Sequence, residues 1–170
     1  MRMAESQTLQ LILWRHADAE DLAHAAEGKR TFAHDADSAR ALTSKGRSQA
    51  RSMAKWLRAR LPEDARVLTS PARRAVETAS ALTKHYQEVA EIGTRHGAAD
   101  LLSAIGWPDL AGTVVVVGHQ PTLGRVAALL VSGRASDWSV KKGAVWWLAR
   151  KSGAGDAEIV VRAVIAPEFT

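Results

Sequence analysis

The chain has 170 residues, 46% of them hydrophobic, which is typical of a single globular domain spanning residues 1–170. It has no cysteine, which excludes disulfides and thiolate chemistry, and no apolar run of about 18 residues, so we expect a cytoplasmic protein without a membrane span. Lys and Arg outnumber Asp and Glu by 23 to 18, but Tyr and Phe are scarce, so we expect a basic solvated surface rather than a nucleic-acid partner.

Strands and helices are expected to alternate along the first half of the chain. The apolar run LQLILW at residues 9–14 predicts a buried strand, and residues 17–40 after it form the longest irregular segment. A helix is expected from a cap at Thr43 or Ser44 to about Arg60, because basic and apolar residues recur there on opposite faces.

The same alternation continues to the end of the chain. We expect a strand at 65–70, helices at 72–86, 98–106 and 121–133, and a strand at 112–118. The last of these strands, GTVVVVG, is β-branched throughout, as an interior parallel strand is. Two late strands, 143–150 and 157–166, are expected to pair across a Gly-rich turn. The pattern predicts an α/β three-layer sandwich, with a mostly parallel central sheet and helices on both faces.

Trp146 and Trp147 in the first late strand have two readings. The strand either lies at a sheet edge, where the pair contacts a second subunit, or packs at least one tryptophan in the core. We expect core packing and a monomer.

Charged and polar side chains follow three of the expected strands at the point where each strand ends. The first strand runs into Arg15 and His16, the second leads to Arg73 and Arg74, and the third leads to His119. Because ligands bind outside the carboxyl ends of parallel strands, these side chains are expected to converge on one crevice.

A second Arg-His pair, Arg95 and His96, follows the segment EIGT. The glycine and threonine there indicate a loop rather than a central strand. We therefore expect His16, held by a rigid strand, to be the reactive histidine and His96 to be a bystander.

Four motifs along the chain together resemble those of a known family. LWRHADAE, LTSKGRSQA, TSPARRAVETA and VVVVGHQPTLG occur in the order and spacing of the histidine phosphatase superfamily, which has the phosphoglycerate mutase-like fold. The resemblance covers nearly the whole chain and is greatest to the small SixA-type phosphohistidine phosphatases. Only 44 residues separate Arg74 from His119, so no lid insertion is expected.

The resemblance implies a role for each matching residue. His16 is expected to be the nucleophile that is transiently phosphorylated, Arg15 and Arg74 to bind the phosphoryl oxygens, and His119 to complete the pocket. Arg40 resembles a position near the pocket. Forked guanidinium groups fit a phosphoryl group in transfer, so no metal or other cofactor is expected.

Two positions depart from the family pattern. Ala17 stands where the family usually has glycine, which would be strained only if the backbone had a positive φ. No carboxylic acid clearly matches the family's proton donor, and Asp18 is the nearest candidate, with a loop-capping role as the alternative. An imidazole leaving group needs much less help from an acid than an alkoxide does.

The sequence therefore predicts a metal-independent phosphatase that acts through phospho-His16, with a phosphohistidine protein as the favoured substrate. A small-molecule phosphomonoesterase acting on sugar or nucleotide phosphates stays open as an alternative. A non-catalytic phosphate-binding module, suggested by Ala17 and the missing acid, is a second alternative.

Overall fold

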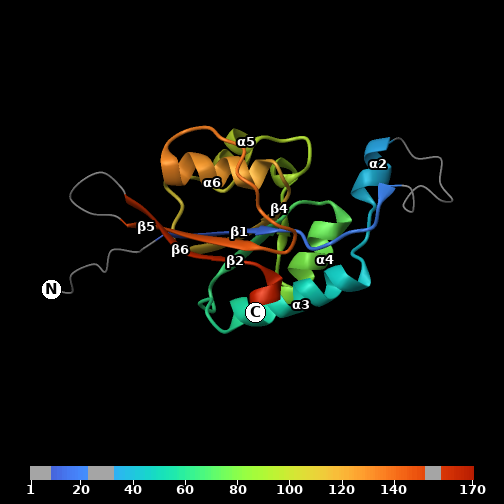
Figure 1. Ribbon diagram of the computed structural model, residues 1–170. Coiled ribbons are helices and arrows are strands. Elements are labelled where there is room, and N and C mark those ends of the chain that lie inside the picture. Colours follow the sequence, from blue (N-terminus) through green and yellow to red (C-terminus); the bar gives the residue numbers. More distant parts are fainter. Residues whose placement is uncertain (1–8, 23–32, 152–157) are drawn as a thin grey trace.

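The computed structural model of the chain describes residues 9–22, 33–151 and 158–170 (Figure 1). Its centre is a six-stranded sheet in the spatial order β3-β2-β4-β1-β5-β6. The strands are β1 (Leu9–Arg15), β2 (Arg66–Thr69), β3 (Gln87–Glu88), β4 (Thr113–Gly118), β5 (Val145–Lys151) and β6 (Glu158–Ile165). The helices are α2 (Ala33–Ser38), α3 (Ser44–Arg58), α4 (Arg73–Leu82), α5 (Ala98–Ala104) and α6 (Thr122–Ser132), with 3-10 turns η1 (Ala90–Ile92) and η2 (Pro167–Phe169).

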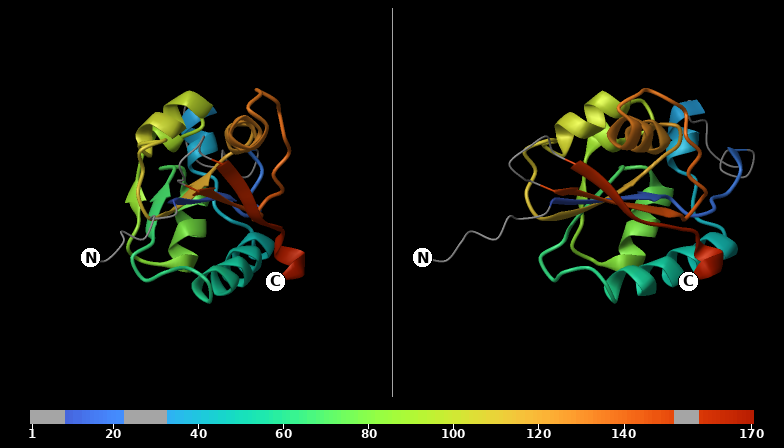
Figure 2. Two further views of the ribbon diagram at one scale, coloured as in Figure 1. Left: turned by 90° about the vertical axis from the view of Figure 1, so that its left-hand side faces the viewer. Right: turned by 60° about the vertical axis from the view of Figure 1, so that its left-hand side comes forward.

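The sheet is parallel on one side of β1 and antiparallel on the other. β1 pairs with β4 in parallel, and β4 and β3 each pair in parallel with β2. β5 runs antiparallel to both β1 and β6. Helices α5 and α6 cover one face and α3 and α4 the other (Figures 1 and 2). The expected α/β sandwich with a mostly parallel sheet is confirmed.

Strand β1 is buried on both faces, which explains its continuous apolar sequence. Leu11 and Leu13 belong to the core under α5 and α6, whereas Ile12 and Trp14 belong to the core under α3 and α4. A parallel strand covered by helices on both sides has this composition. β1 is thus a rigid support for whatever follows its last residue, Arg15.

Helix α3 forms as its sequence predicts. The side chain of Thr43 caps it by accepting a hydrogen bond from the backbone N–H of Gly46 at 3.0 Å. Met53 and Leu57 on its apolar face are fully buried in the core. The basic residues of the opposite face are exposed to solvent: Arg47, Arg51, Lys55 and Arg58.

Two sequence-based expectations need correction. Residues 17–40 are not irregular throughout, because α2 lies within them. Helix α4 ends at Leu82 rather than Tyr86, because the chain turns there and forms the two-residue strand β3, which was not expected.

The expected core packing of the tryptophan pair is confirmed. β5 is an interior strand of the sheet, so the alternative of an edge strand does not hold. Trp147 and Trp146 both pack against the core, on opposite faces of the sheet.

Residues 83–112, between α4 and β4, are all described and hold β3, η1 and α5. Within the described parts of the chain, none of the helices is long and apolar enough to cross a membrane.

Candidate active site

The carboxyl ends of β1, β2 and β4 meet at one edge of the sheet. The backbone N–H of His16 donates to the carbonyl of Gly118, the residue before His119, at 3.0 Å. The two imidazole rings consequently lie side by side, with 5.1 Å between their centroids. Ser70, the residue after β2, bonds to His119 through its hydroxyl. The expected convergence of strand ends therefore takes place for His16 and His119.

The ring of His16 is held in one tautomer by its own loop. Nδ1 lies 2.8 Å from the carbonyl oxygen of Ala17, and a carbonyl only accepts, so Nδ1 carries the hydrogen. Nε2 is left with a free lone pair. Burial, followed by the charges of Arg74 and Arg15, lowers the pKa of His16 to about 3. The ring is therefore neutral and nucleophilic near neutral pH.

His119 is equally buried, and its environment orients it through Ser70. The Nε2 atom of His119 lies 2.7 Å from the Ser70 hydroxyl, which also accepts the backbone N–H of Ala72 at 3.2 Å. If the hydroxyl donates its own hydrogen to Nε2, the ring hydrogen of His119 lies on Nδ1. That Nδ1 atom is buried without a hydrogen-bond partner. Burial, together with His16, lowers the pKa of His119 to about 3.

Two arginines supply positive charge to the same edge. Arg15 donates through Nη1 to the carbonyl of Val140 at 2.7 Å, and its Nε atom is buried and unpaired. Arg74 is only 3% exposed, and its Nε atom is unpaired as well. The neighbouring Arg73 is 60% exposed and pairs with Glu77 instead. Of these two arginines, the chain therefore buries Arg74, the one that the family motif selects.

Asp37 in α2 contacts Arg74 and was not singled out from the sequence. Its carboxylate oxygen Oδ2 accepts from Arg74 Nη2 at 3.0 Å, and its backbone oxygen accepts from Arg74 Nη1 at 2.6 Å. The other carboxylate oxygen, Oδ1, accepts from Arg40 Nη2 at 2.8 Å. Asp37 in α2 thus packs against the candidate site, and Arg40 reaches the site through Asp37.

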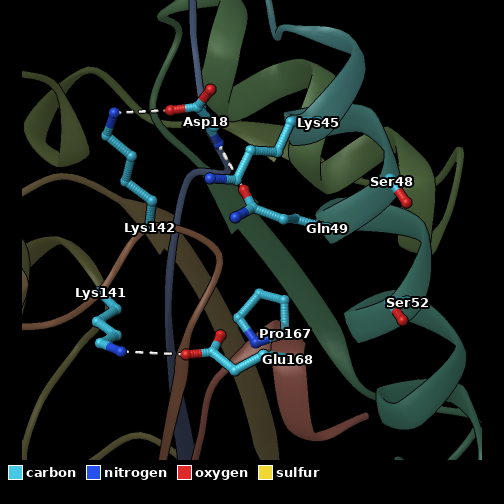
Figure 3. A pocket seen from close by; sticks show the side chains of 9 residues that line it. All are labelled: Asp18, Lys45, Ser48, Gln49, Ser52, Lys141, Lys142, Pro167 and Glu168. Atoms are coloured by element: carbon cyan, nitrogen blue, oxygen red, sulfur yellow. Dashed lines mark hydrogen bonds and ion pairs between the residues drawn. The ribbon is translucent and has the colours of Figure 1, made fainter.

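Asp18 has a different set of partners (Figure 3). Its carboxylate accepts from Lys142 Nζ at 2.7 Å, a contact that Figure 3 shows. It also accepts from the Thr43 hydroxyl at 2.8 Å. These hydrogen bonds outweigh partial burial and lower the pKa of Asp18. Asp18 also lines a cavity of about 640 Å³ with Lys45, Lys142 and Gln49. An ionised, paired carboxylate is a poor proton donor.

Close backbone contacts hold the loop after His16. The N–H of Ala17 donates to the Thr78 hydroxyl of α4 at 3.1 Å, and φ of Ala17 is not positive, so alanine is unstrained there. A Cβ atom on Gly46 would lie only 1.9 Å from the carbonyl oxygen of Asp18. The first turn of α3 therefore needs glycine where it meets this loop.

The second Arg-His pair lies in a turn before α5. His96 is 39% exposed and lies 3.6 Å from the carboxylate of Asp100, and its backbone carbonyl accepts from Thr122. Within the parts of the chain that are described, no three or more His, Cys, Asp or Glu side chains are grouped closely enough to hold a metal ion.

The edge of the sheet is thus built to receive an anion. Among residues 9–22, 33–151 and 158–170, three buried side-chain nitrogen atoms lack hydrogen-bond partners, and they belong to Arg15, Arg74 and His119. The charge of both arginines reaches His16. Buried polar nitrogens are nearly always paired in folded proteins, so three orphans in one place mark a ligand site. Guanidinium groups can bind the oxygens of a tetrahedral oxyanion. The imidazole nitrogen beside them can then attack the central atom of that anion.

Comparison with known families agrees with this geometry. The family model of the histidine phosphatase superfamily (branch 1) matches residues 11–97, just over half of the chain. A comparison with curated protein sequences gives no match.

Solved structures of similar fold cover almost the whole chain. A proposed phosphohistidine phosphatase SixA from Nakamurella multipartitia is 25% identical, with a TM-score of 0.68, 94% of this chain and 98% of that chain covered. The protein histidine phosphatase SixA complexed with tungstate is 23% identical, with a TM-score of 0.67 and coverage of 94% and 98%. A phosphoserine phosphatase from Entamoeba histolytica in complex with 3-phosphoglyceric acid is 16% identical, with a TM-score of 0.64 and coverage of 93% and 97%.

Proposed function

Because the chain belongs to the histidine phosphatase superfamily, we propose that it hydrolyses a phosphoryl group through an intermediate in which His16 is phosphorylated. The observation that carries this proposal is the set of three unpaired buried nitrogens, on Arg15, Arg74 and His119, around a neutral histidine. No step requires a metal or an organic cofactor.

The first step transfers the phosphoryl group to His16. Nε2 attacks phosphorus while the bond from phosphorus to the leaving group breaks. Arg15, Arg74 and the Nδ1 hydrogen of His119 bind the three equatorial oxygens, on which negative charge gathers. The carbonyl of Ala17 accepts the Nδ1 hydrogen of His16 and so stabilises the positive ring that forms.

The second step restores the enzyme. A water molecule attacks the phosphorus of phospho-His16, the N–P bond breaks, and the electron pair returns to Nε2. The proton of the attacking water leaves with inorganic phosphate or passes to solvent. His16 regains the neutral tautomer that its bond to the Ala17 carbonyl favours.

The substrate in this proposal is a protein that carries phosphohistidine. Asp18 and Asp37 both have lowered pKa values, so neither carboxyl is protonated to help an alkoxide leave. A phosphoimidazole takes a proton from solvent on its other ring nitrogen and then leaves as neutral imidazole, whose conjugate-acid pKa is about 6.5, so it needs no carboxylic acid from the protein. The Nakamurella protein, described as a phosphohistidine phosphatase, has the same fold at 25% identity. The sequence, which has no cysteine, agrees with a cytoplasmic location, and we propose a monomer without a nucleic-acid partner.

The test is rapid-quench labelling with a peptide that carries [³²P]phosphohistidine, beside a panel of alkyl and sugar phosphates. We expect an acid-labile phosphoenzyme and turnover that is fastest with the peptide. Faster turnover of an alkyl phosphate would favour the small-molecule phosphomonoesterase. Phosphate binding without any turnover would identify the chain as a binding module.

A further inference from the structure

Asp37 bridges two guanidinium groups at the edge of the candidate phosphoryl site. Oδ1 accepts from Arg40 through Nε at 3.0 Å and through Nη2 at 2.8 Å. Oδ2 accepts from Arg74 Nη2 at 3.0 Å. One carboxylate thus lies between two cations, of which Arg74 is almost completely buried and Arg40 is 20% exposed.

The contacts with Asp37 occupy one end of the Arg74 guanidinium and leave another edge free. Both Nη groups of Arg74 donate to Asp37, one to its carboxylate and one to its backbone oxygen. Arg74 Nε is buried and has no partner. A guanidinium has five N–H donors in one plane, so anchoring the Nη end fixes the direction of the Nε hydrogen.

The charges around Arg74 require such an anchor. Burial and the charge of Arg40 both disfavour the positive form of Arg74, and Asp37 is the acidic group that offsets them. Without this carboxylate, two like charges would face each other in a partly buried place. The side chain of Arg74 would then turn away from Arg40 or from the site.

We infer that Asp37 is a positioning residue, which holds Arg74 by its Nη groups so that the Nε edge is presented to the phosphoryl group. The inference rests on the proposed phosphoryl site. It gives α2 a role in anion binding although no nitrogen or oxygen of α2 needs to touch the substrate.

The first experiment measures binding of inorganic phosphate by calorimetry, which does not depend on turnover. Asp37→Asn keeps the size of the side chain and removes its charge, and we expect phosphate affinity to fall by about 10- to 100-fold. Asp137→Asn, which removes the same charge from an exposed pair with Arg125, is the matched control and should leave the affinity unchanged. Unchanged or tighter binding by Asp37→Asn would overturn the inference, as would a wild-type protein that does not bind phosphate.

The second experiment asks whether Asp37 acts through Arg74. In an Arg74→Ala background, the further change Asp37→Asn should lower phosphate affinity by less than about threefold, because the guanidinium that Asp37 holds is already absent. A full additional loss would assign Asp37 a separate role and contradict the inference.

The third experiment measures turnover, and it separates the proposed phosphatase activity from the positioning role of Asp37. Asp37→Asn should raise KM for the phosphohistidine peptide by more than it lowers kcat, whereas a loss confined to kcat would contradict positioning of a substrate-binding arginine. If the wild-type protein binds phosphate in a way that depends on Asp37 and turns over nothing, the proposed function fails and the inference stands.

Discussion

The chain contains the dipeptide Arg-His twice, and the two copies have opposite surroundings. Arg15 and His16 end a strand that is buried on both faces, and His16 is 6% exposed. Arg95 and His96 lie in a turn, and His96 is 39% exposed. The difference comes from the supporting structure and not from the dipeptide, because the first pair follows a buried strand and its histidine lies next to His119.

The largest expected difference between the two pairs is in catalysis. His16→Ala should abolish both turnover and the acid-labile phosphoenzyme, because the attacking Nε2 is lost while the fold is kept. Rapid-quench labelling measures this directly. Label that persists in His16→Ala would place the intermediate on another residue.

The matching change in the second pair is the control. His96→Ala should keep turnover within about twofold of wild type, because its side chain is 39% exposed, lies in a turn before α5 and pairs with Asp100 at the surface. A large loss at His96 would show that the exposed pair takes part in catalysis and would break the comparison.

The two neighbouring arginines of α4 show the same contrast, because Arg74 is buried and Arg73 is exposed. Arg74→Ala should lower kcat/KM by about 10²- to 10³-fold, the usual effect of removing one donor to developing charge. Arg73→Ala should have little effect, because this side chain is 60% exposed. Steady-state kinetics with one substrate compare the two variants, and equal losses would refute the assignment of Arg74.

Burial of two neutral histidines should also appear in the pH dependence of stability. The pKa values of His16 and His119 fall from about 6.5 in the unfolded chain to about 3 in the folded protein. The unfolded state therefore binds more protons, and stability that is present above pH 6.5 is lost as the pH falls toward 3.

At pH 5 we expect each of these histidines to lower the free energy of unfolding by about 2 kcal/mol relative to pH 7. Urea unfolding at both pH values measures this loss, which should be smaller in His119→Ala. An equal loss in His119→Ala and in wild type would contradict the burial of a neutral ring.

The smallest expected effect is that of Asp18→Asn. Since Asp18 is ionised and paired with Lys142, we expect kcat/KM to fall by less than about fivefold and by the same factor for a phosphohistidine peptide and an alkyl phosphate. The ratio of the two losses is the measurement. A much greater loss on the alkyl phosphate would restore Asp18 as the proton donor.

The parts of the molecule that sequence predicts well are those with a regular pattern. β1 and β4 are continuous apolar runs, and α3 has alternating faces and a threonine cap, so their positions follow from periodicity. The meeting of His16 and His119 follows in turn from the parallel order of their strands.

Other features depend on tertiary contacts that leave no periodic signal. Asp37 lies in α2, a helix of six residues that is too short to give a clear periodic signal, and only the folded chain brings it to Arg74, 37 residues away. Ser70 contacts His119 because β2 and β4 are neighbours in the sheet, and the polar residue directly after β2 was the one available clue. The two-residue strand β3 is too short to produce any alternation.

The pairing of β1 has a consequence for synthesis of the chain. β1 is synthesised before the other strands of the described sheet, but Leu13 pairs with Val116 on one side and with Trp146 on the other. Contacts so distant in sequence form slowly, since a long loop must close before they are gained. A growing chain that has reached only α4 holds His16 and both arginines without the strands that desolvate them. The candidate site is therefore assembled late, after β4 and β5 have joined β1.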